Sequence, residues 1–254
     1  MTLAPFLKAN RFFVVSIIGA LVLSIPARGQ APGTPLAASV AALHQRYAES
    51  FVGNPELYSG PEYVDYALAY HARVNHQYFL TPAMRPGSVD YRGQSFNNIR
   101  LTYDVVRDQV VLGQPTNPLT LHLLSEYVRA FTIESHHFVR LQADSSAGKV
   151  IRTGFYEVLA DGPVELLARR AKRMQKQVVQ PYINVEFIPT ERLFMRKGGT
   201  YYAVGSKAAA LRLMADRSKE VQQYVQQNQL SFKKDFFETS LTLLARYYNS
   251  LSQQ

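Results

Sequence analysis

The serine and histidine residues of this sequence match no complete catalytic motif. The chain has no cysteine, and neither G-x-S-x-G nor H-E-x-x-H occurs in it. S-x-x-K, in which a lysine can serve as the base for a serine nucleophile, begins at Ser146 and at Ser231. The S-D-N and K-T-G sequences that accompany S-x-x-K in known hydrolases are missing. Ser231 is therefore interpreted as a helix cap.

Histidine and carboxylate side chains are the next candidates for chemistry. His136 and His137 are adjacent in an expected strand, so they point to opposite faces of a sheet. Either could hold a metal together with Glu134 or a residue distant in sequence. No metal site and no cofactor are predicted. A hydrolase with a site assembled from Glu134, His136, His137 and Asp104 stays open as an alternative.

Two groups of charged residues are candidates for binding. The first is the polar face of an expected meander over residues 87–112, which carries Asp90, Arg92, Arg100 and Asp104. Such a face could bind a small polar ligand, although mixed charges on neighbouring strands more often form cross-strand pairs in solvent. No catalytic residue is assigned.

The second group is a basic cluster that begins at the end of an expected strand. It consists of Arg169, Arg170, Lys172, Arg173 and Lys176. Five cations in eight residues could meet an anionic partner such as a lipid head group or an acidic glycan. The alternative is a solvated strand end. Export of the chain argues against a nucleic-acid partner.

The elements that must position these residues follow from periodicity. Apolar and polar residues alternate through 87–112, which predicts a three-stranded meander with Val89, Tyr91, Ile99 and Leu101 on one face. A three-residue loop at 92–94 keeps that face intact by parity, whereas a two-residue loop would need a bulge. At the next corner, a loop centred on 107–108 pairs residue 105 with 110 and residue 103 with 112.

Further strands and several helices are expected around the meander. One strand each is predicted within 119–125 and 129–141, and two within 182–205 around a turn at Lys197-Gly198-Gly199. A hairpin over 150–169 turns at Asp161-Gly162. Helical spacing predicts one helix over 36–51 and three more after Ser206, which would cap the first of these three. The expected fold class is α+β: mostly antiparallel β-sheet, with the N-terminal and C-terminal helices packed on it, in a single domain over residues 30–254.

The N-terminus has the composition of a secretory leader. Basic residues come first, residues 12–25 are almost wholly apolar, and small residues follow Pro26. Residues 1–29 are therefore predicted to be a signal peptide, with an exported, periplasmic or secreted, product and no membrane span after cleavage. The leader carries three of the cations, so the mature charge is 9 − 3 = +6.

Three stretches carry a resemblance to a known group. GSVDYRGQSFNNIRLTYDVVRDQVVL at 87–112, GFYEVL at 154–159 and SFKKDFFETSLTLLARYYNSL near the end are similar to a group of exported proteins of Bacteroidota. The resemblance implies an exported bacterial protein with a sheet-rich body. It carries no established activity, and so no catalytic residue.

These features lead to three hypotheses of different classes. The first is a non-enzymatic binding or assembly component of the bacterial envelope, with an envelope protein, a lipid or an anionic glycan as partner. The second is a carrier of a lipid-like or amphipathic ligand, because apolar sheet faces accompany an amphipathic C-terminal helix. The third is the hydrolase described above.

Overall fold

The computed structural model describes residues 55–114, 118–143 and 150–251. The chain divides into two units, residues 1–46 and residues 47–254, and every described residue belongs to the second. The expected leader at 1–29 and the expected helix at 36–51 lie outside the described residues.

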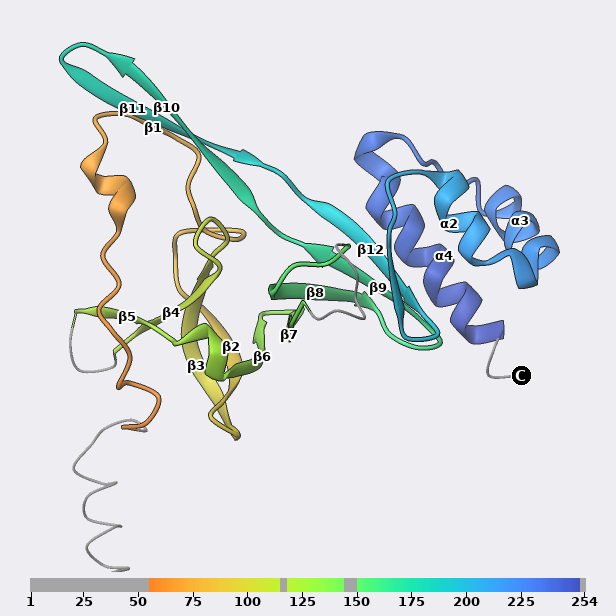
Figure 1. The fold of residues 1–254 in the computed structure, drawn as a ribbon, viewed down its shortest axis with the longest axis horizontal. Helices are drawn as coiled ribbons and strands as arrows, with labels where there is room; N and C mark the ends of the chain where they lie inside the picture. Colours follow the sequence, from red (N-terminus) through yellow and green to blue (C-terminus); the bar gives the residue numbers. More distant parts are fainter. Residues whose placement is uncertain (1–54, 115–117, 144–149, 252–254) are drawn as a thin grey trace, which may run out of the picture. The chain divides into compact units, whose positions relative to one another are not determined.

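A ten-stranded antiparallel sheet forms the body of this unit (Figure 1). Its order is β13-β12-β9-β8-β7-β6-β2-β3-β4-β5. The strands are β2 (Arg85–Tyr91), β3 (Gln94–Asp104), β4 (Gln109–Gly113), β5 (Thr120–His122), β6 (Val128–Ile133), β7 (His136–Leu141), β8 (Gly154–Ala160), β9 (Val164–Arg169), β12 (Arg192–Lys197) and β13 (Thr200–Ala203). The expected class, a mostly antiparallel sheet with C-terminal helices, is confirmed.

The first turn of the meander differs from the prediction. Tyr91 pairs with Gln94, so the loop contains two residues, Arg92 and Gly93, both with positive φ. This is the geometry that two-residue hairpins of primed type require. The register then shifts within β2, and Asn98 of β3 adopts a φ of 55°. The bulge restores the apolar face that a two-residue loop alone would have split.

The second turn keeps the predicted face but not the predicted pairing. Tyr103 pairs with Val110 and Leu101 with Leu112, so the register is displaced by two residues from the expected one. A displacement of two leaves every side chain on its expected face. All four of these side chains are buried. The prediction of a continuous apolar face is therefore confirmed, although the loop is longer than expected.

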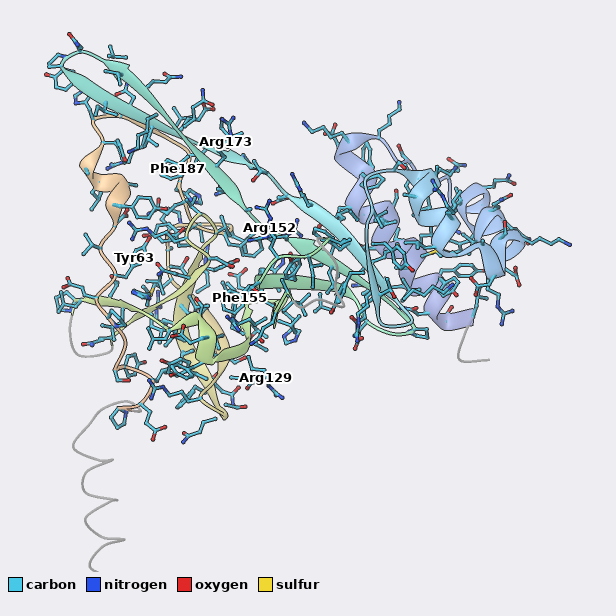
Figure 2. The ribbon with its side chains drawn as sticks, viewed as in Figure 1. Tyr63, Arg129, Arg152, Phe155, Arg173 and Phe187 are labelled. Carbon is cyan, nitrogen blue, oxygen red and sulfur yellow. The ribbon has the colours of Figure 1, made fainter. Side chains whose placement is uncertain are left out.

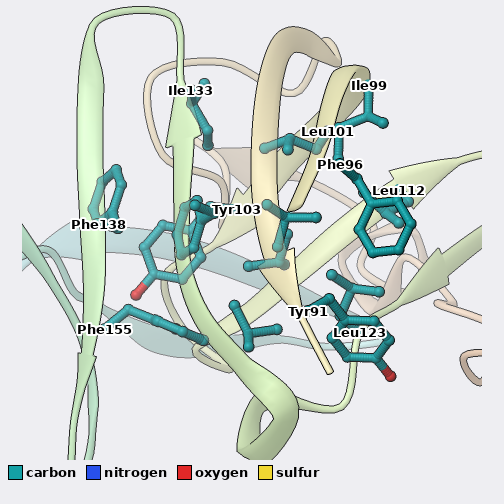
Figure 3. Packing of buried hydrophobic residues seen from close by; sticks show 14 of the residues in the cluster. Tyr91, Phe96, Ile99, Leu101, Tyr103, Leu112, Leu123, Ile133, Phe138 and Phe155 are labelled. Atoms are coloured by element: carbon teal, nitrogen blue, oxygen red, sulfur yellow. The ribbon is translucent and has the colours of Figure 1, made fainter. Parts of the chain in front are cut away.

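An aromatic core lies on that face of the meander (Figure 3). The rings of Phe131 and Phe138 stack at 4.7 Å between centroids, and Tyr103 and Phe155 meet Phe131 edge-on at 5.2 and 5.1 Å. Edge-to-face and offset contacts of this kind add about 0.5–1.5 kcal/mol per pair to the burial of the rings. The cluster draws on four strands and so fixes their order.

Gly87 lies where two strands approach too closely for a side chain. A Cβ at this position would clash with the backbone carbonyl oxygen of Thr132 on β6. Because backbone cannot move aside as a side chain can, we expect Gly87→Ala to lower the free energy of unfolding by about 2–3 kcal/mol in urea titrations. Gly205→Ala is the control, since a Cβ there meets nothing within 4 Å. Equal stability of the two variants would contradict the close approach.

The segment after the meander contains one more turn than predicted. The sequence predicts one strand within 129–141, but these residues form β6 and β7, joined at Glu134, whose φ is 54°. The hairpin of β8 and β9 turns at the predicted Asp161-Gly162. Phe155 and Tyr156, which point to opposite faces of β8, are both buried. Burial on both faces is typical of a strand in the interior of a sheet.

A second, three-stranded sheet extends the β9–β12 pair. It contains β1 (Arg73–Val74), β11 (Tyr182–Pro189) and β10 (Lys172–Val179), in the order β1-β11-β10. Lys172 pairs with Pro189, and Val164 pairs with Lys197 at the far end of β9 and β12. In both pairs the two partners are equally distant in sequence from the turn at Gln180-Pro181, so the two pairs share one register. One antiparallel ladder, hereafter the long ladder, therefore runs from residue 164 to residue 197. The backbone N–H of Thr190 bridges the junction by donating to the carbonyl of Ala171 at 2.9 Å.

Three C-terminal helices follow the last strand. They are α2 (Lys207–Leu213), α3 (Ser218–Gln227) and α4 (Phe237–Leu251). The Ser206 hydroxyl accepts from the N–H of Ala209, which confirms this cap. Ser231 does not cap α4, which begins six residues later, after the short 3-10 turn η4 (Lys234–Phe236). The carbonyl of Ser231 instead accepts a hydrogen bond from Ser240.

The helices cover one face of the sheet at β8, β9 and β12. Leu241, Leu244 and Tyr248 of α4 share a buried cluster with Leu166 of β9 and Met195 of β12. The remaining 3-10 turns are η1 (Tyr66–Ala69), η2 (Ser125–Tyr127) and η3 (Ala215–Arg217). Within the described part of the chain, none of the helices has both the length and the apolar character needed to cross a membrane.

Candidate functional site

The four residues of the predicted polar face do not gather at one place. Asp90 accepts from Arg129 at 3.0 Å and from the Ser95 hydroxyl. The guanidinium of Arg92 lies over the ring of Tyr127, 4.7 Å from its centroid. Arg100 donates to the carbonyl of Met84 at 3.1 Å. Each of these three side chains already has a local partner, as expected for a solvated strand face.

Asp104, the fourth residue, is buried and holds the segment before β2 against the sheet. Its carboxylate accepts from the hydroxyls of Tyr63 at 2.8 Å and Tyr66 at 3.3 Å, and from the N–H groups of Val106 and Arg107, both at 2.9 Å. Burial raises the pKa of Asp104, and these four donors offset part of that rise because they favour the ionised form. Asp104 is therefore a buried structural acceptor.

The residues named for a hydrolase are also separated. The imidazole of His136 bonds to the carboxylate of Glu157 at 2.5 Å, whereas His137 is exposed. Glu134 lies 3.6 Å from Arg85. No group of three or more potential metal ligands occurs among the described residues.

The long ladder divides the basic cluster between its two faces. Arg170 is buried in ion pairs, and Lys172 donates to the carbonyls of His76 and Tyr78 at 2.8 and 2.6 Å. Lys176 lies over the ring of Tyr70, and Arg173 is exposed. Arg169 lines a pocket on the opposite face from Arg170. The cluster is thus five separate environments and not one surface.

The pocket beside Arg169 contains three arginines. It has a volume of about 220 Å³, and its lining includes Arg152, Arg169 and Arg192 (Figure 2 labels Arg152). Arg169 of β9 and Arg192 of β12 are directly opposite each other in the ladder. Directly opposed like charges destabilise a strand pair. None of the three forms an ion pair with a described carboxylate, so this arginine pocket holds uncompensated positive charge.

Apolar side chains build the floor of the arginine pocket. Tyr156 and Phe194 line it and belong to a buried cluster with Ile151 and Leu167. The Tyr156 hydroxyl donates to the carbonyl of Arg152 at 2.9 Å and accepts from its N–H at 3.0 Å. These two bonds fix the backbone that carries one of the three cations. A rigid floor limits the rearrangement that anion binding would require.

One carboxylate lies near the arginine pocket without neutralising it. Asp108 accepts from the Tyr103 hydroxyl at 2.6 Å. Burial raises the pKa of Asp108, and the positive charges of Arg169 and Arg140 lower it in part. No ion pair joins Asp108 to Arg169 in the described structure. Even an ionised Asp108 would leave the three arginines with excess positive charge.

The opposite face of the same junction carries carboxylates in excess. Arg170 pairs with Glu157 at 2.5 Å, with Glu191 at 3.0 Å and with both oxygens of Glu238 at 2.7 Å. Glu191 and Glu238 also line a hollow of about 920 Å³ whose apolar walls include Leu193 and Phe237. Residue alternation along the ladder therefore places Arg169 and Arg170 in different surroundings, although Arg192 lines both the arginine pocket and this hollow.

Sequence reasoning missed Arg152 and Arg192. The signal that could have found Arg192 is the turn at Gln180-Pro181, from which Arg169 and Arg192 are equally distant in sequence. A hairpin folded at that turn must place them opposite each other. Arg152 has no such signal, because the sheet and the Tyr156 hydroxyl bring it to the pocket.

Comparison with known proteins adds no assignment. No protein-family model, curated protein or solved structure matches the chain. The functional argument therefore depends on the geometry of the site.

Proposed function

We propose that this chain is a binding component of the bacterial envelope whose arginine pocket holds an oxyanion such as a phosphate or carboxylate group. The observation that carries the proposal is the direct cross-strand pairing of Arg169 with Arg192, beside Arg152 and without an ion-paired carboxylate among the described residues. The expected leader at 1–29 and the resemblance to exported proteins of Bacteroidota support the location.

The chemistry of the pocket suits an oxyanion. A guanidinium presents N–H donors in a planar fork that matches two oxygens of a carboxylate or phosphate. Two opposed guanidinium groups can both donate hydrogen bonds to one tetrahedral anion, and the negative charge of the anion would offset the repulsion between them. At about 220 Å³ the pocket accommodates a compact anionic group. The rings of Tyr156 and Phe194 offer an apolar surface to whatever bears that group.

Replacing Arg192 is expected to raise stability and to lower the affinity for phosphate. Without an added anion, we expect Arg192→Ser to raise the free energy of unfolding by up to about 1 kcal/mol, because it removes the repulsion from Arg169. We expect the same variant to bind inorganic phosphate about tenfold more weakly, since a charge-assisted hydrogen bond contributes about 1.5–3 kcal/mol. Urea titration measures the first effect, and calorimetric titration at constant ionic strength measures the second.

Arg173→Ser is the matched control for this experiment. Arg173 is exposed, forms no ion pair in the described structure and does not line the pocket. The proposal requires this variant to keep the affinity of the parent for phosphate. It fails if Arg192→Ser binds phosphate as the parent does, or if Arg173→Ser loses as much affinity.

A carrier of an amphipathic ligand is the second candidate. It is supported by the hollow of about 920 Å³, whose lining includes Ile188, Leu193, Val204 and Phe237. Glu191 and Glu238 on this lining are matched by Arg192 and Lys234, and both glutamates pair with Arg170. The formal charges of the lining cancel, so the apolar walls carry the case for an amphipathic ligand.

A further inference from the structure

The closed end of the long ladder exposes apolar side chains on both of its faces. Val178 is 71% exposed, Val179 55%, Tyr182 50% and Ile183 44%, and these four residues are hereafter the apolar tip. Val179 pairs with Tyr182 and Val178 with Ile183, on either side of the Gln180-Pro181 turn. Adjacent pairs of an antiparallel ladder point to opposite faces. Val178 and Val179, on opposite faces, are each more than half exposed, whereas the ring of Tyr182 stacks on that of His71 at 4.0 Å between centroids. Four large apolar side chains this exposed at one hairpin end are unusual.

Cations follow the apolar tip along the ladder. Lys176 pairs with Val185, and Val185 also pairs with Arg73 of β1. At about 3.3 Å per residue, these two cations lie roughly 10 Å from the end of the ladder. Arg173 lies farther along β10 (Figure 2). No Asp or Glu occurs from residue 166 to residue 185, and Glu186, which pairs with Gln175, is the first acidic residue that the ladder meets beyond Lys176.

We infer that the apolar tip inserts into an anionic lipid surface. An apolar segment that enters a bilayer interface reaches about 5–10 Å into the boundary between head groups and acyl chains. The roughly 10 Å between the tip and its first cations would place Lys176 and Arg73 at the level of the lipid phosphates. Tyrosine, with an apolar ring and a polar hydroxyl, is enriched at this depth. The charge of these cations selects anionic over neutral lipid.

This inference goes beyond anion binding in the arginine pocket and does not depend on it. Arg169 of β9 and Arg192 of β12 belong to the ten-stranded sheet, and along the long ladder they lie beyond Lys172 and Pro189 from the tip. Failure of phosphate binding would leave the tip unaffected, and failure of lipid insertion would leave the pocket unaffected.

A single-tryptophan reporter tests the insertion in the full chain. The chain has no tryptophan, so Tyr182→Trp introduces the only one. With vesicles of phosphatidylcholine and phosphatidylglycerol in equal amounts, we expect its emission to shift to shorter wavelength and to be quenched by brominated lipid. The matched control is Tyr127→Trp, because Tyr127 is 49% exposed and lies outside the ladder. Its emission should stay unchanged.

Two further variants separate the contributions to insertion. In the Tyr182→Trp background, Val178→Ser/Val179→Ser should weaken vesicle binding by about tenfold or more, because it removes two insertable side chains. Val64→Ser, at a valine that is 65% exposed elsewhere, should not weaken it. If the emission of the Tyr182→Trp variant does not shift with vesicles, the inference is overturned. A shift without quenching by brominated lipid would also overturn it, since the tip would then be buried against a second copy or another protein surface.

Discussion

Replacing Arg170 by alanine is expected to lower the free energy of unfolding by about 3–5 kcal/mol. Arg170 is 8% exposed and Glu157 is 3% exposed, and they are joined at 2.5 Å. Removal of the guanidinium leaves the Glu157 carboxylate buried with only His136 beside it. An uncompensated buried charge carries the full penalty of desolvation. Urea-induced unfolding, followed by circular dichroism, measures the loss.

The pair of Arg196 and Glu165 provides the control for Arg170→Ala. These side chains meet at 2.9 Å but are 41% and 28% exposed, so Arg196→Ala should lower stability by less than about 1 kcal/mol. The double variant Arg170→Met/Glu157→Gln should recover most of the loss, because neither charge then remains buried. Equal losses of stability in Arg170→Ala and Arg196→Ala would mean that burial of the ion pairs around Arg170 contributes nothing to stability.

Replacing Asp104 is expected to have the second largest effect on the free energy of unfolding. The contribution of Asp104 to stability should also depend on pH. Asp104→Ala leaves two tyrosine hydroxyls and two backbone N–H groups without their acceptor, which should lower stability by about 3 kcal/mol. Asp104→Asn keeps one acceptor oxygen and should lower stability by about 1 kcal/mol at pH 7. The amide does not titrate, and it therefore isolates the ionisation of the carboxylate.

The sign of the pH dependence follows from the direction of the pKa shift. Burial raises the pKa of Asp104 in the folded state above the unfolded value of about 3.9. Between these two values the folded state keeps a proton that the unfolded state releases, so this contribution to stability falls as pH rises. The stability difference between the parent and Asp104→Asn should therefore be larger at pH 4 than at pH 7. A difference that is constant or smaller at pH 4 would contradict the raised pKa.

Alternation in the sequence predicted which side chains of the meander are buried, but not how its turns are made. The two-residue loop at Arg92-Gly93 and the bulge at Asn98 both alter the register, and together they restore the expected face. The alternation of side chains shows which face is buried after both shifts, but it does not reveal the two shifts separately. The apolar stripe of α4 was likewise predicted while its first residue was not, since a serine can also bond locally without capping.

The candidate site was predicted only in part, because its residues meet through a long ladder. Arg169 stood out in the sequence as a member of a basic run, but a run of charges does not show which members are buried. Arg170 became a buried ion-pair centre and Arg169 a pocket residue because adjacent residues point to opposite faces of a strand. The roles of Glu157, Glu191 and Glu238 depend on tertiary contacts that spacing alone does not encode.

The most direct test of the central claim is to locate a bound oxyanion in a crystal soaked with tungstate. Tungstate has the shape and charge of a tetrahedral oxyanion, and its anomalous scattering identifies it without ambiguity. The proposal predicts a strong anomalous peak within hydrogen-bonding distance of both Arg169 and Arg192, and its loss in crystals of Arg192→Ser. Peaks at other exposed cations such as Arg173, with none between Arg169 and Arg192, would contradict the assignment of the arginine pocket as an anion site.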